Sequence, residues 1–408
     1  MKKTRLKKYA SLIARVGVNV QRGQEVIIQA ELDQPEFVKM VVDECYRAGA
    51  KKVSVEWSYQ PLTRSNVRYC TEKVLGTLED WQIAKLERQV EVLPCKIWLM
   101  SEDPDGLDGI NMKKYSSAMA KRGKTIKPIR QKMENKYQWC IAAVPGARWA
   151  KKIFPELRTG AAIEKLWEAI LDTSRVYDDP EGEWKKHNKD LAERCEYLNS
   201  KRLVKLIYKA SNGTDLEVGL SPEVLFMGGE ENALGSGIYF NPNIPSEEVF
   251  TSPMKGQAEG IVYSSKPLAY NGALIDNFWM RFEGGKVVEC GAERNENVLR
   301  ELLAMDEGAS YLGECALVPY TSPINNTGIL FYNTLFDENA ACHLAIGRGF
   351  TNLYRGYENM TEEELHEKGI NDSIVHEDFM IGTRDLEITG ITESGEEIKI
   401  FSGGEWAF

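Results

Sequence analysis

Residues 25–57 read EVIIQAELDQPEFVKMVVDECYRAGAKKVSVEW, and this stretch decides the fold of the N-terminal half. Residues 25–30 are too short and too β-branched for a helix, so they predict a strand. Asp33 and Glu36 have the spacing of a capping box, which predicts a helix directly after this strand. Residues 52–57 predict a second strand. Strand, helix and strand in this order indicate parallel strands joined by a right-handed crossover, which is typical of an α/β domain.

The chain outward from this stretch keeps the α/β character up to about residue 190. Further strands are predicted at residues 95–101 and 139–144. Between them, residues 112–136 are polar and rich in lysine, which indicates a helix with a solvated face. We therefore predict an N-terminal α/β domain at residues 1–190.

The remainder of the chain, residues 191–408, has a different pattern. Short strands alternate with turns rich in Gly and Asn, and Gly284-Gly285 and Ser394-Gly395 lie where hairpin turns are expected. This pattern predicts a mixed, largely antiparallel sheet with a few helices. The whole protein is thus expected to combine the α/β and α+β classes.

Composition and charge exclude several classes of function. The chain has 408 residues and a formal net charge of -10 at pH 7, so its surface repels phosphate backbones and nucleic acid is not an expected partner. The eight cysteines form no CxxC pair, and we interpret them as reduced core residues. No stretch approaches the ~18 apolar residues of a membrane span, and no signal peptide is recognisable. We expect a soluble, cytoplasmic protein that binds no membrane.

Four histidines limit the choice of candidate site residues. His187 and His366 lie in highly charged helical stretches, and we interpret both as surface residues without a role. His376 and Asp378 are two residues apart in a predicted strand, so their side chains project from the same face. An imidazole and a carboxylate on one rigid strand are typical of a divalent metal site. A His–Asp hydrogen bond on a sheet face is the simpler alternative.

Further residues can join this pair. Glu314 interrupts an apolar strand, where an isolated carboxylate is costly unless it is paired or bound to a metal. His343 precedes a Gly-Arg-Gly turn, and a buried structural histidine is the alternative there. Glu247 and Glu248 lie in a loop stiffened by prolines. The full set has three carboxylates and two imidazoles, enough for two divalent ions: Glu248, Glu314, His343, His376 and Asp378.

The segments around these residues resemble one enzyme family. PSEEVFTSP, LGECALVP, NAACHLAIGRG and NDSIVHEDFMIG occur in this order. They resemble the corresponding segments of the metallo-aminopeptidases of peptidase family M29. GQEVIIQA, YRAGAKKVSVEW and PGARWAKKIFPE extend the resemblance over nearly the whole chain.

The resemblance implies a metallo-aminopeptidase that hydrolyses N-terminal residues from short peptides with a bridging water. It implies two divalent ions (Zn, Co, Mn or Mg), with metal ligands at Glu248, Glu314, His343, His376 and Asp378. Glu248 or Glu314 would be the catalytic carboxylate that relays the proton. A register error of one residue would exchange Glu248 with Glu247. The resemblance also implies a homodimer in which the N-terminal domain limits access to the C-terminal catalytic domain.

One position departs from the family's pattern. A tyrosine is usual a few residues after the first histidine, where it is thought to assist the reaction, and this chain has Phe350 there. A phenyl ring donates no hydrogen bond to a developing oxyanion, and such a bond can be worth ~3 kcal/mol, or a hundredfold in rate. Tyr354 or Tyr357 could substitute from the same loop.

Two other functions stay open on the sequence. A related branch of the fold resembles ring-cleaving dioxygenases, which hold one iron with a triad similar to His343, His376 and Asp378. The retention of Glu248 and Glu314 favours the two-metal interpretation over this one. The other alternative is a non-catalytic peptide-binding relative, because Phe350 replaces the expected tyrosine.

Overall fold

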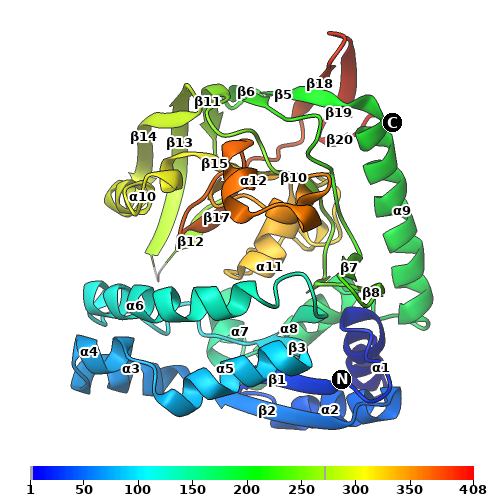
Figure 1. The fold of residues 1–408 in the computed structure, drawn as a ribbon, viewed down its shortest axis with the longest axis vertical. Helices are drawn as coiled ribbons and strands as arrows, with labels where there is room; N and C mark the ends of the chain where they lie inside the picture. Colours follow the sequence, from blue (N-terminus) through cyan, green and yellow to red (C-terminus); the bar gives the residue numbers. More distant parts are fainter. Residues whose placement is uncertain (1–2, 271–272) are drawn as a thin grey trace. The chain divides into compact units, whose positions relative to one another are not determined.

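The computed structural model describes residues 3–270 and 273–408, and the chain divides into two compact units (Figure 1). The first comprises Met1–Lys185 and Glu230–Pro245, and the second comprises Lys186–Gly229 and Ser246–Phe408. The sequence predicted a single domain boundary at residue 190. In the structure, Glu230–Pro245 also belongs to the first unit, which is therefore formed by two separate stretches of the chain. The second of these stretches adds a strand to the first unit's sheet.

The first unit is built on a five-stranded parallel sheet with the strand order β2-β1-β3-β4-β9. Its strands are β1 (Glu25–Glu31), β2 (Lys52–Ser58), β3 (Cys95–Met100), β4 (Trp139–Ala143) and β9 (Asn243–Ile244), and a separate hairpin contains β7 (Glu231–Ala233) and β8 (Ile238–Phe240). Its helices are α1 (Lys3–Leu12) with a π-helical turn at Ile13–Gly17, α2 (Pro35–Ala48), α3 (Gln60–Tyr69), α4 (Glu72–Gly76), α5 (Asp80–Val92), α6 (Met112–Gln131), α7 (Ala147–Ile153) and α8 (Thr159–Thr173). The predicted parallel pairing of the first two strands is confirmed, with Glu25 opposite Lys52.

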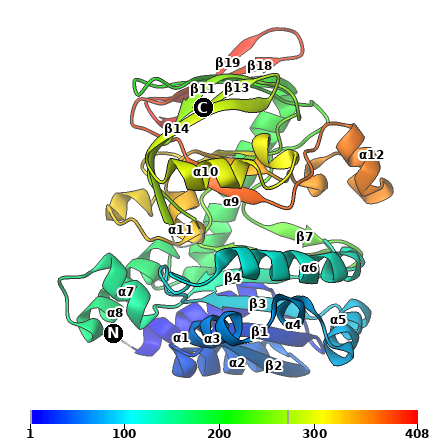
Figure 2. The same cartoon turned by 90° about the vertical axis from the view of Figure 1, so that its left-hand side faces the viewer.

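One face of this sheet is apolar because alternate residues of its strands point to the same side. Val26 and Ile28 of β1 are at most 1% exposed. The helices bring an aromatic cluster into the same unit, where the ring centroid of Phe37 lies 5.4 Å from that of Tyr9 and 5.1 Å from that of Trp167. The three rings come from α2, α1 and α8, so this cluster joins helices far apart in sequence (Figure 2).

Asp33 does not cap α2, and this sequence prediction is wrong. The helix begins after Gln34, which makes no side-chain hydrogen bond to it. The Asp33 carboxylate instead accepts hydrogen bonds from the Ser101 hydroxyl at 3.1 Å and from the Ala147 backbone N–H at 3.3 Å. Asp33 therefore connects the segments that follow β1, β3 and β4. These contacts join residues 68 and 114 positions apart in the sequence, and local spacing does not predict them.

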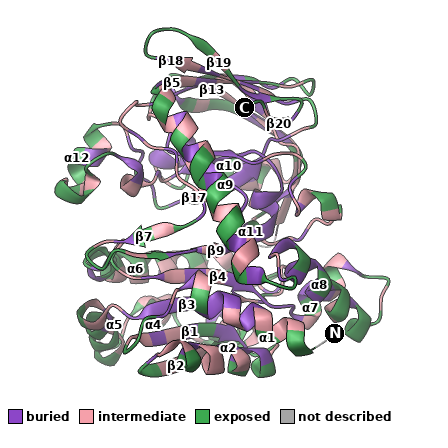
Figure 3. Cartoon of the chain, turned by 90° about the vertical axis from the view of Figure 1, so that its right-hand side faces the viewer, coloured by how far each residue is buried: buried purple, intermediate pink, exposed green. Residues whose placement is uncertain are grey.

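The long helix α9 (Pro180–Lys201) runs from the first unit into the second, because the division between them falls after Lys185. Its buried residues recur at helical spacing: Trp184, Leu191, Cys195 and Leu198. Figure 3 shows the resulting alternation of buried and exposed turns along this helix. Among residues 3–270 and 273–408, no helix combines the length and the apolar character that crossing a membrane requires.

The second unit contains a large antiparallel sheet with the order β12-β13-β11-β6-β5-β18-β19-β20, in which β14 also pairs with β13. Its strands are β5 (Leu203–Lys209), β6 (Asp215–Gly219), β11 (Ala258–Tyr263), β12 (Leu268–Tyr270), β13 (Ala273–Glu283), β14 (Lys286–Arg294), β18 (Glu387–Thr392), β19 (Glu397–Ser402) and β20 (Glu405–Trp406). The helices are α10 (Glu296–Leu303), α11 (Thr334–Asp337) and α12 (Glu362–Glu367), with 3₁₀ turns at Gly308–Ser310, Asn325–Thr327, Glu338–Ala340, Thr351–Leu353 and Tyr357–Asn359. The predicted fold class, a parallel α/β part followed by largely antiparallel sheets, is confirmed.

A smaller antiparallel sheet carries the residues singled out from the sequence. Its order is β10 (Val249–Thr251), β15 (Leu312–Leu317), β16 (His343–Gly347) and β17 (His376–Met380). One face of this sheet belongs to the apolar core of the second unit, through Val249, Cys315, Leu317, Leu344, Ile346 and Phe379. The opposite face is left for polar side chains.

Candidate metal centre

The pairing of strands in the small sheet places the predicted site residues on one face. Glu314 of β15 is opposite Ala345 of β16, which is opposite Asp378 of β17. Residues directly opposite each other share a face, and so do residues two apart in one strand. His343 and His376 therefore lie on the same face as Glu314 and Asp378. Glu248 directly precedes β10 at the other edge of the sheet.

A β-bulge at Gly313 turns Glu314 towards this face. Leu312 pairs with Ile346, but Glu314 pairs with Ala345, so one residue of β15 has no partner. If the strand paired regularly through Gly313, Glu314 would share a face with Leu312, which lies in the apolar core. Gly313 is suited to this position because an added Cβ would lie 2.3 Å from the Arg348 carbonyl oxygen.

The donor atoms form two groups that share Glu314. One group consists of Glu248, Glu314 and His343, and the other consists of Glu314, His376 and Asp378. Within each group, the ligand atoms lie within 4.8 Å of one another. It is therefore Glu248, and not its neighbour Glu247, that joins the cluster. Carboxylate oxygens and imidazole nitrogens at this spacing are a donor set that fits divalent transition-metal ions.

Both imidazoles are oriented by backbone carbonyls. His343 Nδ1 donates to the carbonyl of Ala341 at 3.2 Å, and His376 Nδ1 donates to the carbonyl of Arg348 at 2.7 Å. Each Nε2 atom then faces carboxylates: His343 Nε2 lies 3.2 Å from Glu248, and His376 Nε2 lies 3.2 Å from Glu314 and 3.5 Å from Asp378. A backbone acceptor on Nδ1 is the usual way to present Nε2 to a metal.

Burial and mutual repulsion shift the pKa values of these groups. Burial raises the pKa of Glu314 to about 7; the charges of Asp378 and Glu248 add to this, while the hydrogen bond from His376 opposes it. Burial acts to lower the pKa of His343, but its hydrogen bond to Glu248 and the nearby carboxylates outweigh burial and raise it to about 9. Bound cations would favour the ionised form of Glu314 and the neutral form of His343.

Glu338 is an acid of this site that the sequence analysis missed. It lines a small pocket together with Asp378. Burial and the neighbouring carboxylates raise its pKa well above the usual value. The only sequence signal is its place five residues before His343, in a 3₁₀ turn that local patterns do not predict.

His187 is not a surface residue, and its interpretation from the sequence is wrong. Its side chain is 10% exposed, and Nε2 donates a hydrogen bond at 2.7 Å to the carbonyl of Ser246, two residues before Glu248. A signal for this was present: His187 falls on the buried stripe of α9, three residues after Trp184 and four before Leu191. His366, the other histidine interpreted as superficial, is 24% exposed.

Phe350 lies beside the candidate centre. Its ring centroid is 5.0 Å from that of His376 and 5.3 Å from that of Phe250. Tyr354 is 8% exposed and packs in a neighbouring apolar cluster with Val224 and Leu353. Tyr357 packs against the same cluster. That the hydroxyl of Tyr354 or Tyr357 takes the place of the one missing at Phe350 stays a prediction.

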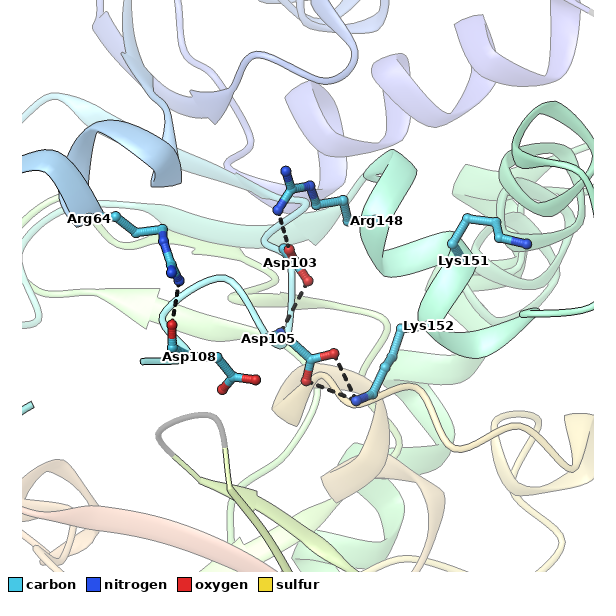
Figure 4. Close-up of a pocket in the computed structure, with 7 residues that line it drawn as sticks. All are labelled: Arg64, Asp103, Asp105, Asp108, Arg148, Lys151 and Lys152. Carbon is cyan, nitrogen blue, oxygen red and sulfur yellow. Dashed lines mark hydrogen bonds and ion pairs between the residues drawn. The ribbon is translucent and has the colours of Figure 1, made fainter. Parts of the chain in front are cut away.

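A second group of charged residues lies in the first unit, after β3 and at α3 and α7 (Figure 4). A pocket of about 540 Å³ is lined by Arg64, Asp103, Asp105, Asp108, Arg148, Lys151 and Lys152. Lys152 Nζ lies 2.8 Å from the Asp105 carboxylate, and Arg148 lies 3.3 Å from Asp103. Arg64 donates to the carbonyl of Asp108 at 2.6 Å. Since these contacts fasten the loop after β3 and offset its charges, we interpret them as structural.

Comparison with known proteins agrees with this geometry. The sequence profile of the thermophilic metalloproteases (M29) matches residues 2–406. The chain belongs to the M29 metalloprotease family. It is 41% identical over 406 residues to aminopeptidase AmpS of Bacillus subtilis and 38% identical over 406 residues to aminopeptidase T of Thermus thermophilus. Both alignments cover 99% of this chain and 98% of the relative. The sequence prediction of an M29 metallo-aminopeptidase is confirmed at the level of the family.

Two solved structures resemble this M29 chain to different degrees. Wild-type AmpT from Thermus thermophilus superposes with a TM-score of 0.91 at 37% identity, and the match covers all of both chains. 2,5-Dihydroxypyridine dioxygenase from Pseudomonas putida has a TM-score of 0.52 at 12% identity, covering 99% of this chain and 96% of the dioxygenase. The second likeness concerns the fold alone, so it gives no support to the dioxygenase alternative as a function.

We predict that Gly313→Ala disturbs the bulge that orients Glu314. The new Cβ would lie 2.3 Å from the Arg348 carbonyl oxygen and 2.4 Å from that of Gly347, so the strands must shift. Overpacking of this kind costs about 1–3 kcal/mol, which denaturant unfolding would measure. The matched control is Gly123→Ala in α6, where a Cβ meets nothing within 4 Å and helix propensity favours alanine. Equal stability of Gly313→Ala and the wild type would contradict the role of the bulge.

Proposed function

We propose that this M29 enzyme is a two-metal aminopeptidase that releases the N-terminal residue of short peptides. The observation that supports this most strongly is the sharing of Glu314 by two donor groups on one sheet face. A carboxylate common to two groups is suited to bridge two cations, and a single ion would leave one group without a counter-charge.

The ligand sets follow from the two groups. Glu248, Glu314 and His343 would hold one divalent ion, and Glu314, His376 and Asp378 the other. Glu338 offers a further oxygen beside Asp378. With Glu338, four carboxylates match the charge of two divalent cations. Zn, Co, Mn and Mg all bind mixed carboxylate and imidazole donors, with different affinities.

The residues of the chain prepare the site for peptide hydrolysis. When bound, the ions would supply an acidified water and polarise the scissile carbonyl. The carbonyls of Ala341 and Arg348 hold the imidazoles of His343 and His376 with Nε2 directed at the carboxylates. Glu248 or Glu314 is proposed to accept the proton of the attacking water and pass it to the leaving amine.

The relatives' names supply the class of substrate. AmpS of Bacillus subtilis and aminopeptidase T of Thermus thermophilus are named as aminopeptidases, and both align over almost the full length of this chain. We infer the same activity here. An aminopeptidase distinguishes a free α-amine from a blocked one, so N-acetylated peptides should not be cleaved.

We also propose that the enzyme is a cytoplasmic homodimer in which the N-terminal domain limits access to the catalytic domain. All eight cysteines are free and seven are buried, which suits a reducing compartment. The first unit exposes large apolar side chains on α3, α4 and α5, including Leu62 (60%), Tyr69 (76%) and Trp81 (65%), as interaction surfaces often do.

Sedimentation equilibrium should give twice the mass of one chain, and a single-chain mass would contradict the dimer.

Removal and return of metal should control the activity. Chelator-treated protein is expected to release no amino acid from unblocked dipeptides, and Zn, Co or Mn should restore release. Elemental analysis should find about two ions per chain.

Glu314→Gln should lower kcat at least about a hundredfold, because the variant loses the shared carboxylate.

The exposed Glu363→Gln change is the matched control for Glu314→Gln and should leave kcat and metal content unchanged. One iron per chain together with oxygen-dependent ring cleavage would favour the dioxygenase alternative. Stoichiometric metal binding with no cleavage of any peptide would favour the non-catalytic alternative.

Phe350→Tyr should raise kcat on unblocked dipeptides. The Phe350 ring lies beside His376, and we propose that a hydroxyl on it reaches the candidate centre and donates to a developing oxyanion. One such donor is worth roughly 10²–10³ in kcat where nothing else supplies it. A fast wild-type enzyme with an unchanged Phe350→Tyr variant would instead indicate another donor, and Tyr354→Phe and Tyr357→Phe would then identify it.

A further inference from the structure

Asn339 joins two segments of the site through one buried amide. The residue is 0% exposed and lies in the 3₁₀ turn Glu338–Ala340. Its Oδ1 accepts a hydrogen bond from the backbone N–H of Glu247 at 2.7 Å. Its Nδ2 donates to the carbonyl of Leu335 at 3.0 Å and to Glu338 Oε1 at 3.2 Å. Both polar ends of the side chain are therefore used, and they bind segments about ninety residues apart.

The segment that Asn339 binds is the one that presents Glu248. Glu248 stands between the anchored N–H of Glu247 and the three-residue strand β10, and its carboxylate lies 3.2 Å from His343. A short edge strand alone gives this segment few backbone hydrogen bonds. His187 holds the preceding carbonyl of Ser246 at 2.7 Å, so contacts on both sides of the Ser246–Glu247 peptide fix its course.

The other end of the Asn339 amide acts on the opposite side of the cluster. Its N–H donates to the carboxylate of Glu338, which lines one pocket with Asp378. A single side chain thus contacts the backbone next to Glu248 and the carboxylate of Glu338. An aspartate would place a second negative charge against Glu338, and an apolar side chain would leave the buried N–H of Glu247 without this acceptor.

We propose that Asn339 is a positioning residue of the metal centre, which sets the carboxylates of Glu248 and Glu338 relative to each other. The proposal rests on the two-metal function proposed above. Hydrogen bonds that orient metal ligands from outside typically contribute 10–100-fold to metal affinity or activity. The alternative is that Asn339 serves only the fold, through its bond to the carbonyl of Leu335.

The test compares metal affinity with stability in the full-length chain. Chelator-treated wild type, Asn339→Asp and Asn339→Ala are titrated with Zn²⁺ against a competing chelator, and denaturant unfolding of the metal-free proteins is measured in parallel. Asn339→Asp keeps the acceptor for Glu247 but loses the donor to Glu338, whereas Asn339→Ala loses both. We expect both variants to bind Zn²⁺ about 10–100-fold more weakly than the wild type.

Asn199→Asp is the matched control, because this amide also clamps a backbone but not at the metal centre. Asn199 donates to the carbonyl of Phe226 at 2.9 Å and accepts from its N–H at 2.8 Å. Its replacement should lower stability without changing Zn²⁺ affinity. If both Asn339 variants bind Zn²⁺ as tightly as the wild type, the positioning role is overturned and the proposed function stands. If the wild-type chain binds no divalent ion, both the proposed function and the positioning role are overturned.

Discussion

The rest of the second unit depends on one electrostatic constraint: three carboxylates share a buried face of one small sheet. Glu248, Glu314 and Asp378 are 7%, 4% and 8% exposed. Burying one isolated carboxylate is costly, and like charges nearby add to the cost. The imidazoles of His343 and His376, each within 3.5 Å of a carboxylate, offset part of this charge. Burial, together with the charges of Asp378 and Glu248, raises the pKa of Glu314 to about 7, so bound cations would stabilise its ionised form.

The backbone meets this constraint by separating an apolar face from a charged one within single strands. In β17, His376 and Asp378 face the cluster, while Phe379 between Asp378 and Met380 packs in the core. In β15 the same separation needs the bulge, because regular alternation would point Glu314 inwards. Gly313 and Gly347 allow this local geometry: a Cβ on Gly347 would lie 2.1 Å from the carbonyl oxygen of Val375. The geometry of the charged cluster thus depends on two glycines, Gly313 and Gly347, which carry no charge themselves.

Periodicity and residue type predicted the framework and the donor set, and they did not predict what holds the donors in place. The β1-α2-β2 start follows from the apolar pattern of residues 25–57, and the shared face of His376 and Asp378 follows from their spacing of two. The bulge at Gly313 depends on pairing between distant strands. Asp33, His187 and Asn339 act through contacts over roughly 60 to 110 residues, which local patterns do not contain.

The distant likeness to a dioxygenase shows why the donor set, and not the fold, decides the chemistry. At 12% identity the two chains share an architecture, and a shared architecture does not determine the reaction. A single-iron centre needs only a triad such as His343, His376 and Asp378. In that case Glu248 and Glu314 would be buried carboxylates beside imidazoles already engaged with the metal, and burial would favour their replacement by neutral residues. Their burial at 7% and 4% exposure therefore supports the proposed second cation.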